Sequence, residues 1–199
     1  MGEQDAGMTD HRSALTTAYG QAAAVVTAVR PDQLSLPTPC PQYDVAVLVD
    51  HLVGAARRAV EVGRGETPAG DEFPHVELAD APALLRDAGH ESAKVWADDA
   101  KLSETTTMPW GETYTGATLV DMYLAEIVAH AWDLARATGQ DGAIDEDLAA
   151  VALDAARSML KPEYRDLMEK GNPFGAEVPC SPSAPAPARF AAFMGRDPN

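Results

Sequence analysis

A carboxylate and an imidazole lie one helical turn apart in an apolar segment of the chain. Glu126 and His130 are four residues apart within residues 122–134, where most of the other side chains are aliphatic. Residues at this spacing share one side of a helix, with Cβ atoms about 5–6 Å apart, so both side chains can reach one ion. A buried glutamate costs free energy unless a cation or hydrogen bonds compensate its charge. The pair therefore predicts two ligands of a metal site.

A third ligand must come from another helix, and His51 is the candidate. Leu48, Leu52 and Ala55 share with it the i, i+3, i+4, i+7 spacing of one helix face, which predicts that His51 points into the core. Each signal is weak alone, because core histidines usually have hydrogen-bond partners and Glu–His pairs at this spacing often lie on the surface. Two inward imidazoles and one inward carboxylate together predict a zinc-type site with one position left for water or substrate.

Composition and charge limit the class of protein. The 199 residues are 46% hydrophobic, which is enough for one domain with a proper core. A formal charge of −16 argues against binding to nucleic acid or to anionic membranes. Cys40 and Cys180 form no Cys-x-x-Cys motif, and the chain has neither an 18-residue apolar stretch nor a secretory N-terminus. We expect a reduced, cytoplasmic protein that acts on a small molecule, and the sequence leaves a homodimer open.

Caps, apolar stripes and helix breakers predict an all-α four-helix bundle. The predicted helices run from Thr9 or Asp10 to about Val29, from the cap Asp44 to about Val62, from Asp80-Ala-Pro82 onward, and from about Ala117 to Thr138 before Gly139. Residues 105–115 predict a short hairpin or ordered loop before the fourth helix.

A helical, proline-rich extension is predicted after the bundle. Its elements are a fifth helix capped by Asp145, a short amphipathic piece from Pro162 to Lys170, and a last helix from Ala188 to Met194. We expect a single domain over residues 1–199. Within it, residues 8–140 form the metal-binding four-helix bundle and residues 141–199 form a C-terminal helical extension packed on it.

Five short motifs make the chain similar to a known family. They are Thr38-Pro-Cys40, Asp50-His-Leu-Val-Gly54, Pro109-Trp-Gly-Glu112, the segment His130-Ala-Trp-Asp-Leu-Ala-Arg-Ala-Thr-Gly139, and Gly195-Arg-Asp-Pro198. Across residues 12 to 198 the chain resembles actinobacterial metal-binding proteins related to mycothiol-dependent maleylpyruvate isomerase, within the DinB-like four-helix-bundle superfamily.

The resemblance also implies which residues hold the metal. In that isomerase the ligands are a histidine of the second helix and a Glu-x-x-x-His pair of a later helix, which correspond to His51, Glu126 and His130. Tyr43 stands where the family usually has a tryptophan. We expect this chain to be without the isomerase's full-length C-terminal domain, so the resemblance does not carry over a substrate.

The activity that the resemblance implies is metal-assisted thiol chemistry. Zinc is the first expectation, with nickel or another first-row ion as a competitor by availability. Coordination would convert a cofactor thiol of pKa near 8.5 into a nucleophile at neutral pH. The expected protein is a thiol-dependent isomerase or transferase that uses mycothiol as co-substrate on a small electrophile. Two alternatives stay open: a metal-binding protein without catalysis, and a metal-hydroxide-dependent hydrolase or cyclase acting on a specialised metabolite.

Asp133, three residues past His130, has two interpretations. It could accept a hydrogen bond from the imidazole of His130 and so support a metal ligand. It could instead pair with Arg136 or with a cation on another helix.

The remaining candidates concern pocket walls and packing. Tyr43 and Trp110 are candidates for pocket walls, with simple packing as the alternative. Trp132 is expected in the core, Cys40 is expected to be a small buried hydrophobe, and His90 is expected on an exposed helix face.

Overall fold

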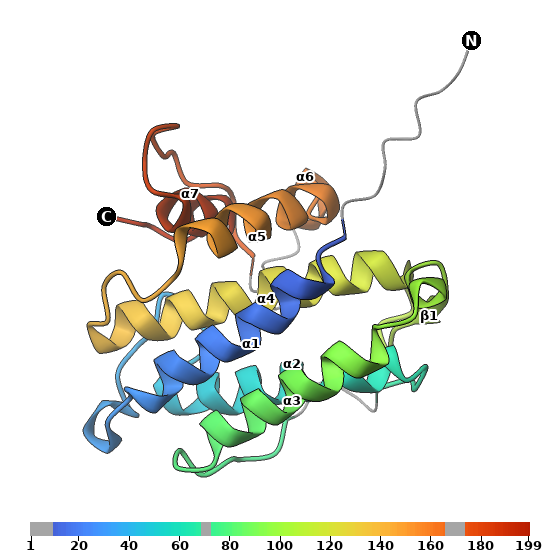
Figure 1. The fold of residues 1–199 in the computed structure, drawn as a ribbon. Helices are drawn as coiled ribbons and strands as arrows, with labels where there is room; N and C mark the ends of the chain where they lie inside the picture. The colour runs from blue at the N-terminus through green and yellow to red at the C-terminus, as the bar shows by residue number, and fades with distance from the viewer. Residues whose placement is uncertain (1–9, 69–72, 166–173) are drawn as a thin grey trace.

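Four long helices run side by side in the computed structural model, and shorter helices cover one side of them (Figure 1). The structure describes residues 10–68, 73–165 and 174–199. Predictions for Thr9, for residues 166–170 and for residues 172–173 lie outside the described residues. The elements are α1 (Arg12–Thr27), η1 (Pro31–Gln33), α2 (Val45–Gly63), α3 (Ala81–Val95), η2 (Asp99–Leu102), β1 (Thr105–Thr107), β2 (Thr113–Thr115), α4 (Gly116–Thr138), α5 (Glu146–Met159), α6 (Pro162–Arg165) and α7 (Ala186–Phe193).

The bundle places α2 and α4 next to each other. Helix α1 packs against α3 and α4, and α2 packs against the same two helices. Strands β1 and β2 pair antiparallel, with Thr106 opposite Tyr114, directly before α4. The predicted all-α bundle with a short hairpin before its fourth helix is therefore confirmed.

Side-chain caps begin two of the helices. The carboxylate of Asp44 accepts a hydrogen bond from the backbone N–H of Val47 at the start of α2. Asp145 does the same for Leu148 at the start of α5. Helix α4 ends at Gly139, whose φ of 72° lies in the left-handed region that glycine adopts without strain. These local signals explain why the sequence predicted these three helix boundaries correctly.

Two predicted helix starts were wrong by one or two residues, and α1 ends at Thr27 rather than about Val29. Helix α1 has His11 rather than Asp10 at its N-cap position, although the carboxylate of Asp10 still accepts a hydrogen bond from the backbone N–H of Arg12. Helix α7 starts at Ala186 rather than Ala188 because a proline is tolerated in the first turn of a helix, where its missing N–H would have no partner.

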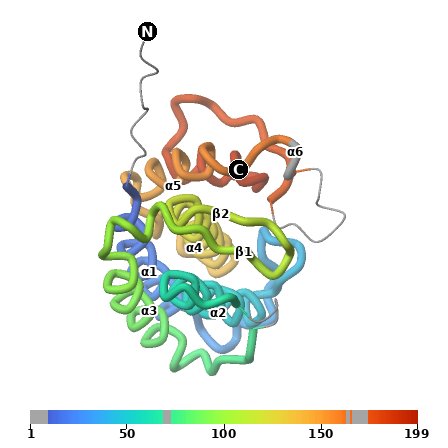
Figure 2. Tube along the Cα trace, turned by 90° about the vertical axis from the view of Figure 1, so that its right-hand side faces the viewer, coloured from blue at the N-terminus to red at the C-terminus, as the bar shows by residue number. Residues whose placement is uncertain are grey.

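Helix α4 is the centre of the molecule. In the end-on view it lies between the other bundle helices and the C-terminal helices (Figure 2). Helix α5 packs on α4 and α1, while α7 packs on α5 and α4. Helix α4 is therefore buried on nearly every side, including the side that carries His130 and Asp133. No helix in the described ranges is long and apolar enough to cross a membrane.

Candidate metal centre

The structure brings His51, Glu126 and His130 together. Each offers one ligand atom, and the three atoms lie within 4.8 Å of one another. His51 comes from α2 and the other two come from α4, so the contact between these helices creates the group. Nε2 of His51 lies 3.0 Å from Oε1 of Glu126. The side chains of His51 and Glu126 are 14% and 23% exposed, so the group lies just beneath the surface.

The imidazole of His130 is held in one orientation. Its Nδ1 lies 3.1 Å from Oδ2 of Asp133, and both side chains are fully buried. Burial lowers the pKa of His130 and outweighs the opposing hydrogen bond to Asp133. A neutral ring that donates through Nδ1 keeps its lone pair on Nε2. Nε2 has no hydrogen-bond partner in the described part of the chain, and a buried nitrogen in that state is costly unless something binds it.

The pKa of Glu126 is lowered despite its burial, which favours the ionised carboxylate. Burial by itself would raise its pKa, but the hydrogen bond from His51 and nearby positive charge, including that of Arg58, outweigh burial and hold the pKa below its usual range. In this state Nε2 of His51 donates a proton to the carboxylate. One proton thus lies between the carboxylate oxygen and the histidine nitrogen. A cation bound by both atoms would take its place.

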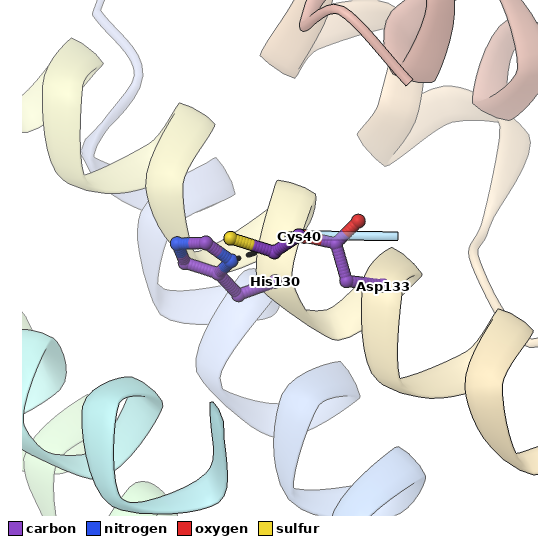
Figure 3. A group of neighbouring side chains, drawn as sticks. All are labelled: Cys40, His130 and Asp133. Carbon is purple, nitrogen blue, oxygen red and sulfur yellow. Dashed lines mark hydrogen bonds and ion pairs between the residues drawn. The ribbon is translucent and has the colours of Figure 1, made fainter. Parts of the chain in front are cut away.

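A second group of possible ligands shares His130. Cys40, His130 and Asp133 also offer atoms within 4.8 Å of one another, and all three residues are buried. Figure 3 shows the thiol of Cys40 against the imidazole of His130. Burial raises the pKa of the Cys40 thiol, against the effect of the Arg196 charge. Cys40 is a small buried side chain, as predicted, but its neighbours make this group a candidate metal site as well.

Asp133 already has strong partners. Nε of Arg196 donates to its Oδ1 at 3.2 Å and Nη2 donates to its Oδ2 at 2.9 Å. Burial would raise the pKa of Asp133, but the hydrogen bond from His130 and the charge of Arg196 lower it. A cation in the second group would therefore have to displace Arg196 from Asp133, or the proton from Nδ1 of His130.

Both interpretations of Asp133 describe part of what the structure shows. Asp133 does accept a hydrogen bond from His130, and it also forms an ion pair. Of the two expected kinds of partner, Arg136 is wrong, because it pairs with Asp141 at 3.0 Å. The ion pair of Asp133 comes from another part of the chain, through Arg196. Sequence reasoning missed Arg196. The signals for it are the glycine before it, which indicates a turn after the last helix, and its place in the Gly195-Arg-Asp-Pro198 motif, to which no role was assigned.

Aromatic rings flank the histidines. The ring centroid of Tyr43 lies 4.9 Å from the ring centroid of His51 and 6.2 Å from that of His130. The ring of Phe73 meets the ring of His51 edge to face, with the ring centroids 5.2 Å apart. It lies directly against α2 at Gly54, where an added Cβ would overlap a ring carbon of Phe73. Gly54, three residues past His51, therefore lets this ring reach the site.

Among the described residues, the other aromatic and histidine candidates make no ring contact with His51 or His130. Trp110 is 46% exposed at the hairpin tip, and its ring contact among described residues is with Tyr114. Trp132 is buried, which confirms the prediction of a core residue. His90 is exposed as predicted, and His75 is exposed beside Asp50.

The chain is similar to a known protein family and to two relatives from one bacterium. Residues 15–135 match the family described as "Mycothiol maleylpyruvate isomerase N-terminal domain". Two relatives are the uncharacterized proteins MT0763 and Rv0738 of Mycobacterium tuberculosis, from strains CDC 1551 and H37Rv. Each is 33% identical over 174 residues, which cover 87% of this chain and 91% of the relative. The match to the family includes His51, Glu126, His130 and Asp133, whereas Arg196 lies beyond it.

Proposed function

Because the chain belongs to the mycothiol maleylpyruvate isomerase N-terminal domain family, we propose that it binds one divalent ion, zinc first, through His51, Glu126 and His130. We further propose that the ion serves to activate a low-molecular-weight thiol such as mycothiol for isomerisation, addition or transfer on a small electrophile. The observation that carries the proposal is the buried Nε2 of His130, which lacks a partner among the described residues and belongs to a ring beside His51 and Glu126.

The donor set suits such an ion. Two neutral imidazoles and one carboxylate are common ligands of catalytic zinc, and three protein ligands leave a position for substrate or water. When bound, the ion supplies a net positive charge that lowers the pKa of a cysteine-type thiol from its ordinary value near 8.5.

The chain's own residues have separate roles in this proposal. Asp133 keeps the proton of His130 on Nδ1, so that Nε2 is available as a ligand. Glu126 supplies the only carboxylate of the set. Tyr43 and Phe73 restrict access of water to the ligands because their rings lie against His51.

Cys40 gives the matched control for the choice of ligands. We expect zinc analysis of protein purified without an affinity tag or added metal to find about one ion per chain in the wild type and in Cys40→Ser. His51→Ala should lose the ion. The opposite pattern, with zinc lost from Cys40→Ser and kept in His51→Ala, would move the metal to the group of Cys40, His130 and Asp133.

A thiol-addition assay over several electrophiles tests the chemistry. Turnover should require both the metal and the thiol, and chelator should abolish it. Metal-dependent turnover without any thiol would instead support a hydrolase or cyclase. Stoichiometric metal with no turnover on any electrophile tried would support a non-catalytic metal-binding protein.

A further inference from the structure

The C-terminal end of the described chain reaches the interior beside the candidate metal centre. Arg196 is 3% exposed and lies against Asp133, which is fully buried on α4. Its guanidinium donates to both oxygens of Asp133, and its Nη1 donates to the backbone carbonyl of Met194 at 2.8 Å. A long cationic side chain is buried this deeply only where its hydrogen bonds are well satisfied.

A glycine turn sends Arg196 inward. After α7, the backbone N–H of Gly195 donates to Ala192 and that of Arg196 donates to Ala191, which closes the helix end. Gly195 has a φ of 82°, and an added Cβ would lie 2.7 Å from the backbone of Gly175. The close contact between these two glycines lets the last residues fold back onto α4 instead of continuing outward.

We propose that Arg196 is a positioning residue of the metal centre, which acts through Asp133 to fix the ring of His130. The inference rests on the proposed metal-binding function. The fork of Arg196 is planar and engages both carboxylate oxygens, so it fixes the rotation of Asp133. Oδ2 of Asp133 is then held 3.1 Å from Nδ1 of His130, and this hydrogen bond sets both the proton position and the direction of Nε2.

The pairing also explains how a buried carboxylate can support His130 without disturbing the charge of the site. Asp133 with no cation beside it would be a buried, uncompensated charge next to the imidazole. With Arg196 in place the pair is neutral overall, and the carboxylate still accepts the hydrogen bond from His130. The extension, which lies outside the matched part of the family, thus completes the support of a ligand that lies inside it.

Binding of Zn²⁺ and the visible spectrum of the Co²⁺-loaded protein test the inference. We expect Arg196→Met and Asp133→Asn each to weaken Zn²⁺ binding roughly tenfold or more, which is typical for partners of a ligating histidine. Both should also change the Co²⁺ spectrum, which reports the geometry at the ion. The double variant should be no worse than Asp133→Asn alone. Arg189→Met is the matched control, because Arg189 lies in α7 but bonds to the carbonyl of Ala184, and it should behave as the wild type.

The outcomes separate this inference from the proposed function. A wild type that binds neither Zn²⁺ nor Co²⁺ removes the proposed function, and the inference with it. A wild type that binds both, beside an Arg196→Met protein with unchanged affinity and spectrum, overturns the inference and leaves the function intact. Losses that add up in the double variant would also overturn it, because Arg196 would then act by another route. If Arg196→Met does not fold, Arg196→Lys decides. It keeps the charge but loses the fork, and wild-type affinity and spectrum in that variant would count against the inference.

Discussion

Glu126 is the residue at which a metal ligand and a structural ion pair can be told apart. Glu126→Gln removes the charge but keeps an oxygen that can accept the hydrogen bond from His51. We expect metal affinity to fall at least tenfold, and the unfolding free energy of the metal-free protein to change by no more than about 1.5 kcal/mol. Thermal melts of wild type and variant measure both quantities. Melts with chelator report the stability of the metal-free protein, and the loss of stabilisation by metal reports the weaker binding. A destabilisation equally large in both conditions would show that Glu126 is structural and not a ligand.

His51 differs from the exposed histidines of the chain in its surroundings. His51→Ala should abolish stoichiometric metal, because it removes one of three ligands whose atoms lie within 4.8 Å of one another. His75→Ala and His90→Ala should keep it, since both side chains are exposed and neither belongs to a group of possible ligands among the described residues. Elemental analysis of the three variants provides the comparison, and full metal in all three would mean that the third ligand is another residue.

At the level of elements, a single added methyl group in the turn after α7 should destabilise the protein. Gly195→Ala places a side chain at positive φ and against Gly175, so we expect it to destabilise the protein by roughly 2 kcal/mol or more. Gly20→Ala is the control, because a Cβ there meets nothing within 4 Å inside α1. It should leave stability unchanged or raise it by up to about 1 kcal/mol. Equilibrium urea denaturation measures both, and equal effects at the two glycines would contradict the role assigned to the turn.

For the whole molecule, lowering the pH changes the free energy of unfolding through two opposing effects. Lower pH relieves the repulsion within a chain of formal charge −16. At the same time, the lowered pKa of His130 means that the unfolded chain takes up a proton below its ordinary pKa of 6.5 while the folded chain resists it. This second effect leaves stability intact above pH 6.5 and reduces it as pH falls below that value, by up to about 1.4 kcal/mol per pH unit.

Comparison with His130→Gln isolates the histidine, because the general charge effect is common to both proteins. In the presence of chelator, the difference in unfolding free energy between wild type and variant should shift against the wild type between pH 7.5 and pH 5.5. A difference that stays constant over this range would mean that His130 is not held neutral by burial.

The sequence alone determined the helices and the central pair of side chains, because these depend on local spacing. Asp44, Asp145 and Gly139 are adjacent to the helix ends that they define. Glu126 and His130 share a helix face by periodicity alone, and the apolar stripe around His51 predicted its direction. Each of these signals lies within one or two helical turns.

Only the tertiary structure decided what surrounds that pair, since those contacts join residues far apart in the chain. Arg196 lies 63 residues from Asp133, and its side chain arrives through a turn that requires Gly195 to meet Gly175. Cys40 lies against His130, and Phe73 lies against His51 because Gly54 leaves room for its ring. No periodicity predicts such contacts. They depend on how α2, α4 and the C-terminal segment pack, and on which polar groups that packing buries together.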